Sequence, residues 1–157
     1  MSNILIYLSF FIFVIYDLFS DPDCILTVHV STTDNPDNIT DETISENVND
    51  TLTHPNEAVR PGCSDILRYF QELGLKICGS KPENSVSIYI ICKDLSALNE
   101  MKSLTESGVL KTKVEELINI LITSSLLVTI TVTVDESDLK QCTARFSDRG
   151  KYLIMNN

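Results

Sequence analysis

The chain has 157 residues and a formal net charge of −10, with 22 Asp and Glu against 12 Lys and Arg. That length can bury one modest core, so we expect a single domain. Without a clustered basic face, the acidic balance excludes nucleic acid as a partner and excludes a polybasic membrane-surface site. Only two histidines are present, so the side chain most used for acid–base catalysis is scarce.

Residues 1–20 are predicted to be a signal peptide. The apolar run NILIYLSFFIFVIY meets Asp17 after about four helical turns, which is shorter than the roughly 20 apolar residues that span a bilayer. The small residue Ser20 favours cleavage before Asp21, although no Lys or Arg precedes the run. We therefore expect a secreted, extracellular protein with no stable membrane insertion after cleavage. The alternative is an uncleaved membrane anchor.

Residues 21–30 contain the first predicted strand, CILTVHV. In it Leu26, Val28 and Val30 alternate with polar positions. His29 occupies one of the polar positions. Because the sequence offers it neither a nucleophile nor an orienting partner, we interpret His29 as a solvated residue on the outer face of a strand and not as a catalytic base.

Residues 31–59 are predicted to form an acidic, glycosylated, flexible insert. The whole net charge lies at or before residue 59, because residues 1–59 hold ten acids and Arg60 is the first basic residue. The insert is rich in Ser, Thr, Asn and Asp and poor in large apolar groups, so burial cannot offset its ordering entropy. Asn38 and Asn49 each begin an Asn-x-Thr sequence and are the predicted glycosylation sites.

Five cysteines favour disulfides over a metal site. No C-x-x-C sequence is present, and both histidines precede most of the cysteines, so the spacing for zinc is missing. We predict that Cys63 pairs with Cys78 across a helix and that Cys92 pairs with Cys142 between two strands. Cys24 is then the odd cysteine, either buried in the first strand or used for a disulfide-linked dimer.

Residues 60–157 are predicted to be the main body of the α+β domain. The expected elements are a helix capped by Ser64 and ended by Gly74, a central strand over residues 85–92, and two helices separated by Gly108. A strand then alternates apolar residues with three threonines. After it, alternation at Cys142, Ala144 and Phe146 predicts a terminal hairpin that turns at residues 148–150. The second of the two helices carries the broadest apolar face, made of Leu110, Val114, Leu117, Ile118 and Leu121.

The predicted fold class is α+β. We expect a two-layer sandwich in which 2–3 helices cover one face of a mainly antiparallel or mixed sheet of about 4–5 strands. The strand at residues 128–134 has one apolar face and one hydroxyl face. Its outward residues, Thr129, Thr131 and Thr133, are the candidate binding face.

Catalytic sequence motifs are missing: the chain contains no phosphate-binding loop, no G-x-S-x-G and no H-E-x-x-H. The acidic run at residues 135–138 lacks the glycine and the final glutamate of a calcium loop, so we interpret it as a solvated turn. We therefore predict a non-enzymatic protein-binding module without cofactor or metal, such as a host-interaction factor, whose partner is an extracellular or cell-surface protein. The alternative is a small secreted hydrolase or a carrier of apolar ligands.

Overall fold

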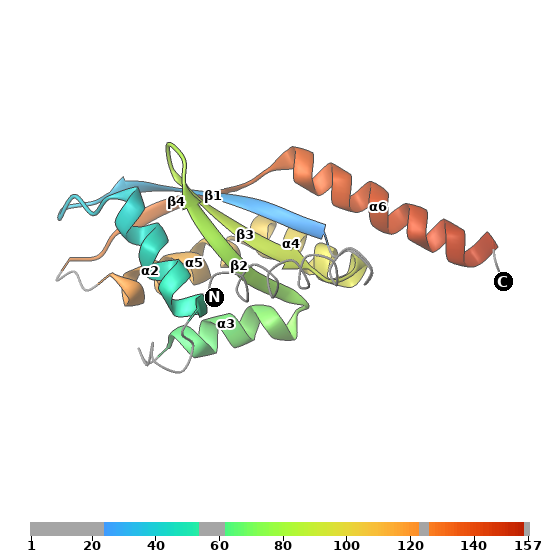
Figure 1. Ribbon diagram of the computed structural model, residues 1–157, viewed down its shortest axis with the longest axis horizontal. Helices are drawn as coiled ribbons and strands as arrows, with labels where there is room; N and C mark the ends of the chain where they lie inside the picture. Colours follow the sequence, from blue (N-terminus) through green and yellow to red (C-terminus); the bar gives the residue numbers. More distant parts are fainter. Residues whose placement is uncertain (1–23, 54–61, 123–125, 156–157) are drawn as a thin grey trace, which may run out of the picture.

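The computed structural model describes residues 24–53, 62–122 and 126–155. Its strands form one antiparallel sheet in the order β2-β3-β1-β4. The strands are β1 (Cys24–Asp34), β2 (Leu75–Pro82), β3 (Val86–Cys92) and β4 (Thr129–Val134). The described helices are α2 (Asp41–Thr53), α3 (Cys63–Glu72), α4 (Leu95–Ser107), α5 (Val109–Leu121) and α6 (Glu136–Met155). Figure 1 shows the resulting α+β arrangement.

The connectivity follows the β-α-β-β-α-β, or ferredoxin-like, plan. Two helices, α2 and α3, connect β1 to β2, and another two, α4 and α5, connect β3 to β4. The first strand lies between β3 and β4. Helix α6 follows β4 as an addition to this plan and extends beyond the end of the sheet (Figure 1).

One face of the sheet forms the core. In the register of the two central strands, Leu26 is opposite Ile90 and Val28 is opposite Ile88, and all four side chains are fully buried. The predicted apolar face of α5 is also completely buried, and α5 contacts α2, α3, α4 and β4. All of these helices therefore lie on the same side of the sheet, and the predicted two-layer α+β arrangement is confirmed.

The prediction that residues 31–59 form a flexible insert is wrong for residues 31–53. The first strand continues to Asp34, and α2 packs against β2. Ile44 and Val48, one helical turn apart, are each 1% exposed in the core. Thr40 caps the helix, because its hydroxyl accepts from the Thr43 N–H at 3.2 Å. This acidic segment is therefore part of the folded domain.

The second strand was not predicted, because the expected helix ends at Gly74 and the next expected strand begins at residue 85. Leu75 and Ile77 are buried, whereas Lys76 and Cys78 are exposed, which is the alternation of a strand with one buried face. The preceding helix begins at Cys63 after Gly62, so Ser64 lies inside its first turn and is not the cap. Gly74, with φ +81°, follows the end of α3, as predicted.

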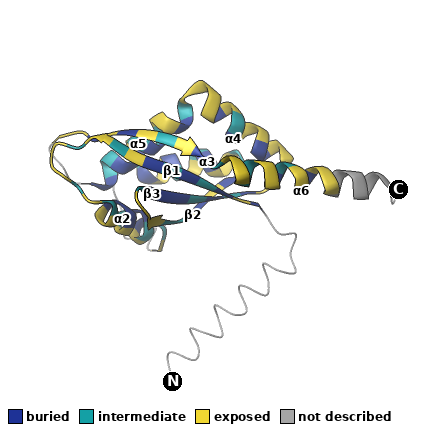
Figure 2. Cartoon of the chain, turned by 90° about the horizontal axis from the view of Figure 1, so that it is seen from above, coloured by how far each residue is buried: buried dark blue, intermediate teal, exposed yellow. Residues whose placement is uncertain are grey.

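The predicted C-terminal hairpin is wrong, because its residues belong to α6. Cys142 and Phe146 are buried and Leu139 is half-buried, a spacing of three and four residues that matches a helix. Ala144, which the hairpin would have placed beside them, is exposed. Asp135 fixes the start of the helix, since its carboxylate accepts from the Asp138 N–H at 3.0 Å. Figure 2 shows that the sixth helix exposes most of its described residues.

The predicted signal peptide at residues 1–20 lies outside the described residues, as do residues 54–59 of the predicted insert. Within residues 24–53, 62–122 and 126–155, no helix combines the length and the apolar character that crossing a bilayer requires.

Candidate functional site: the open face of the sheet

The face of the sheet opposite the helices is the candidate site, and we call it the open face. Side chains that alternate with the buried positions of the four strands make up this face. By the strand registers they are Ile25, Thr27, His29, Ser31, Lys76, Cys78, Lys81, Ser87, Tyr89, Ile91, Thr129, Thr131 and Thr133. Two ends of this surface differ in chemistry, one being apolar and the other rich in hydroxyls.

The apolar end of the open face lies on β1 and β3. Ile25 is opposite Ile91, and Thr27 is opposite Tyr89, in the same part of the register. Ile25 is 54% exposed, while Tyr89 and Ile91 are half-buried. An aromatic ring with an apolar neighbour is the composition found at the centres of protein interfaces.

The hydroxyl-rich end of the open face lies on β4 and β1. Thr129, Thr131 and Thr133 are all exposed, which confirms that this strand turns its threonines away from the core. Ser31 is opposite Thr131, and the Thr131 hydroxyl reaches the Ser31 carbonyl at 3.5 Å. The predicted threonine face on β4 is therefore one part of a surface to which all four strands contribute.

His29 joins the two central strands to the start of α6. Its Nδ1 lies 3.4 Å from Ser87 Oγ and its Nε2 lies 3.5 Å from Asp135 Oδ2. A neutral imidazole with its proton on Nε2 satisfies both contacts, donating to Asp135 and accepting from Ser87. The sequence predicted no polar partner for His29, and the structure corrects this point.

The arrangement of Ser87, His29 and Asp135 does not make a nucleophilic site. Both distances exceed those of good hydrogen bonds, and Ser87 is only 2% exposed. Ser87 also lies in a central strand, opposite His29 on one side and Lys81 on the other. The neighbouring backbone N–H groups are therefore committed to the sheet, and no oxyanion hole can form from them.

The pKa of Asp135 is lowered, chiefly because its carboxylate accepts from the Asp138 N–H and further because of His29. Its own N–H donates to the Thr27 carbonyl at 2.9 Å. Asp138 Oδ2 accepts from the Thr27 N–H at 2.8 Å. The acidic run at residues 135–138, predicted to be a solvated turn, thus caps the sixth helix and extends the hydrogen bonding of β1.

At each outer edge of the sheet, an asparagine side chain pairs with the backbone of one residue. On β2, Asn49 Oδ1 accepts from the Ser80 N–H at 2.8 Å, and Asn49 Nδ2 donates to the Ser80 carbonyl at 3.1 Å. Before β4, Asn119 Oδ1 accepts from the Val128 N–H at 2.8 Å and its Nδ2 donates to the Val128 carbonyl at 2.9 Å. Each asparagine satisfies one N–H and one C=O that would otherwise be unpaired at an edge, which makes edge-to-edge pairing at that residue less favourable.

The predicted disulfide between Cys63 and Cys78 is incompatible with the structure. Cys78 is exposed on the open face, whereas Cys63 is buried on the helical side of the sheet. All five cysteines lie among the described residues, and the structure carries them as thiols. Cys63 and Cys78 lie on opposite faces of the sheet, so the bracketing of a helix in sequence was misleading.

The predicted pair Cys92 and Cys142 lies in one cluster of buried thiols together with Cys24. Cys24 is opposite Cys92 in the register, and Cys142 lies against both on α6. Burial, followed by the contact with Cys24, raises the pKa of Cys142 to about 12. A thiol held this firmly in the neutral form is a poor nucleophile and a poor metal ligand. Among the described residues no group of His, Cys, Asp and Glu is arranged to hold a metal ion.

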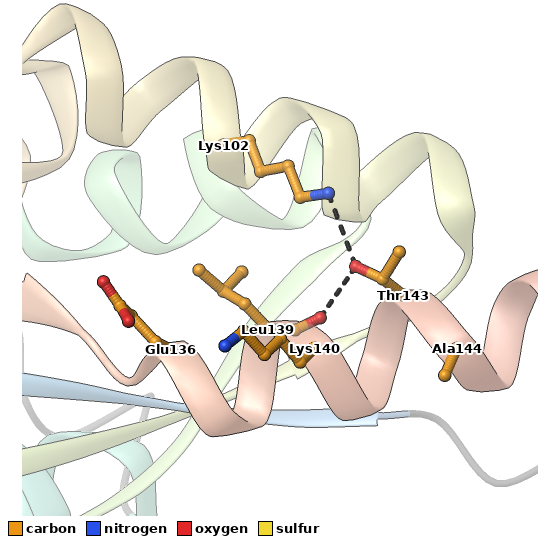
Figure 3. Close-up of a pocket in the computed structure, with 6 residues that line it drawn as sticks. All are labelled: Lys102, Glu136, Leu139, Lys140, Thr143 and Ala144. Atoms are coloured by element: carbon orange, nitrogen blue, oxygen red, sulfur yellow. Dashed lines mark hydrogen bonds between the residues drawn. The ribbon is translucent and has the colours of Figure 1, made fainter.

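A groove of about 550 Å³ lies between α4 and α6 (Figure 3). Lys102 Nζ donates to Thr143 Oγ1 across it at 3.4 Å, and Glu136 and Lys140 also line it. The groove is open to solvent and is bordered by charges. It therefore lacks the enclosure that a carrier of apolar ligands requires.

No family model, no curated protein and no solved structure gives a match to this chain. The functional interpretation therefore depends on the site itself. Ferredoxin-like connectivity adds little, because this plan hosts many unrelated functions.

Proposed function

We propose that the chain is a secreted, non-enzymatic binding module that holds another protein on the open face of its sheet. The observation that carries the proposal is the contrast between the two faces. One is covered by helices, and the other, which spans four strands, presents an apolar end on β1 and β3 and a row of threonines on β4. Because threonine hydroxyls both donate and accept, such a surface can satisfy the polar groups of a partner without introducing charge.

The chemistry of the open face indicates the character of the partner. Most of its side chains are neutral, and Lys81 is engaged with Glu83 at 2.9 Å. Lys76, at the edge, is an exposed positive charge. We therefore expect a folded protein surface of low charge, with an apolar patch opposite the apolar end and an acidic group opposite Lys76.

The alternative functions receive less support. A hydrolase would need an accessible nucleophile with free N–H donors nearby, but Ser87 is buried in a central strand. A carrier would need an enclosed apolar cavity, and the groove between α4 and α6 does not supply one, because it is open to solvent and edged by Lys102, Glu136 and Lys140.

The test uses two variants of the open face and one matched control. Ile25→Asp places a charge in the apolar end, and Thr131→Glu places one in the threonine row. Asn99→Glu introduces the same charge at an exposed position of α4, on the helical side. Each purified protein is immobilised and used to capture proteins from extracellular fluid and from cell surfaces, followed by mass spectrometry. Thermal unfolding verifies that each variant is folded.

We expect a protein that the native chain and Asn99→Glu retain equally and that both open-face variants lose by tenfold or more. Equal capture by all four proteins would contradict the proposal. A second contrary result would be that the native chain dimerises in solution and that Ile25→Asp makes it monomeric. In that case the occupant of the open face is another copy of the chain.

A further inference from the structure

The two Asn-x-Thr sequences lie in opposite structural settings. Asn38 is exposed in the turn between β1 and α2, whereas Asn49 lies on α2 with its side chain turned toward the edge of β2. From this contrast we propose that the folded, exported protein carries an N-linked glycan on Asn38 and an unmodified amide on Asn49. The inference goes beyond the binding function and does not depend on it.

Asn38 is presented to solvent by a well-held turn. Its N–H donates to the Asn35 carbonyl at 3.1 Å, and its φ of +52° is a left-handed conformation that asparagine tolerates. The Asn35 side chain holds both backbone groups of Ile39, at 2.9 and 2.7 Å. The side-chain amide of Asn38 makes no hydrogen bond to any described residue, so a glycan there displaces nothing.

Asn49, by contrast, is occupied. Its Oδ1 accepts from the Ser80 N–H at 2.8 Å and from the Ser80 hydroxyl at 3.2 Å, and its Nδ2 donates to the Ser80 carbonyl at 3.1 Å. The hydroxyl of the same sequon is engaged too, because Thr51 is 7% exposed and donates to the Asn47 carbonyl at 2.9 Å.

The stereochemistry of the amide makes glycosylation and this pairing exclusive. Because Oδ1 and Nδ2 of Asn49 face the N–H and C=O of one residue, Ser80, the donated hydrogen is the one on the same side of the C–N bond as Oδ1. A glycosylated asparagine is a secondary amide, which strongly prefers the trans form. In that form the sugar carbon occupies the position of the donated hydrogen. A glycan on Asn49 therefore removes the bond to Ser80 and would lie between α2 and β2.

The modification itself transfers an oligosaccharide from a lipid-linked diphosphate donor. A bond forms between Asn38 Nδ2 and C1 of the first sugar, the bond between C1 and the diphosphate oxygen breaks, and one Nδ2 proton is lost as the lipid diphosphate leaves. The same transfer to Asn49 on a nascent chain yields a product that cannot close the edge of β2. Such chains are expected to be depleted from the folded, exported pool.

The experiment expresses the full chain in cultured animal cells, once with its own N-terminus and once with a standard secretion signal fused to that N-terminus. Secreted protein is treated with a glycosidase that converts glycosylated asparagine to aspartate, and the converted sites are mapped by peptide mass spectrometry. Asn38→Gln removes the predicted site. Thr51→Ala removes the Asn49 sequon but leaves the Asn49 amide in place, and serves as the matched control.

We expect near-complete conversion at Asn38, none at Asn49, loss of one glycan in Asn38→Gln and unchanged gel mobility in Thr51→Ala. A glycan on Asn49 in most secreted molecules, or an unmodified Asn38 in the version with the standard signal, would overturn the proposal. Glycosylation of Asn38 only with the standard signal supports the site and instead counts against secretion by the chain's own N-terminus.

Discussion

The side-chain amide of Asn119 pairs with both backbone groups of Val128, accepting at 2.8 Å and donating at 2.9 Å. The amide makes the two backbone hydrogen bonds that an adjacent strand would otherwise make with Val128. Asn49 does the same for Ser80 on the opposite edge of the sheet. One turn earlier on α5, Glu115 Oε2 accepts from the Ile130 N–H at 3.1 Å. The helix that fills the core therefore also protects an edge of the sheet.

Asn119→Ala should lower stability and expose that edge. Each hydrogen bond contributes roughly 0.5–1.5 kcal/mol net, so the loss of the pair is expected to cost about 2 kcal/mol in urea unfolding. The freed edge should also raise concentration-dependent aggregation, measured by light scattering. Asn99→Ala, at an exposed position of α4, is the control and should change stability by less than about 0.5 kcal/mol. An Asn119→Ala protein as stable as this control would contradict the assigned role.

Ile44→Ala tests whether the acidic segment is part of the fold. Ile44 is 1% exposed and packs in the core, so its truncation should cost about 2–5 kcal/mol. The neighbouring Glu46 is exposed, and Glu46→Ala should stay within about 0.5 kcal/mol of the native chain. If chemical denaturation gave the same midpoint for the native chain and both variants, α2 would not be docked.

The sequence predicted those elements whose apolar period was unambiguous. The alternation around Ile88 in β3 and around Ile130 in β4, and the broad apolar face of α5 around Val114, each allowed one interpretation. The α2 helix was missed because its apolar side chains that face the core are only Ile44, Val48 and half-buried Leu52. Their spacing of four residues was the available signal, obscured by the surrounding acids and amides.

The C-terminal prediction failed because one short pattern fits two periods. Cys142, Ala144 and Phe146 alternate as in a strand, but Leu139, Cys142 and Phe146 fit a helix. The capping aspartate, Asp135, favours the helix.

The open face was only partly predictable. The threonine row follows from alternation in one strand, whereas the meeting of His29, Ser87 and Asp135 depends on strand order, which local sequence does not encode.

Asp135 should contribute a pH-dependent part of the stability. Its pKa is lowered in the folded chain, first by the Asp138 N–H and also by His29. A lowered folded pKa stabilises the protein above the unfolded value of about 3.9, and this contribution is lost as the pH falls through the folded pKa. Asp135→Asn retains a capping side chain but removes the charge. The difference in Tm between the native chain and Asp135→Asn should therefore be larger at pH 7 than at pH 3. An equal difference at both pH values would contradict this assignment.

The two environments of the cysteines predict a sharp difference in reactivity. With a pKa of about 12, only about one Cys142 thiol in ten thousand is ionised at pH 8, and its side chain is buried. Cys78 also has a raised pKa, mainly from partial desolvation, but it is exposed on the open face. Iodoacetamide at pH 8 should thus label Cys78 in the reduced, folded chain and reach Cys142 only after unfolding. Peptide mass spectrometry measures both rates, and Cys78→Ser should abolish the early label. Labelling of Cys142 as fast as that of Cys78 would show that α6 does not stay docked on β1 in solution.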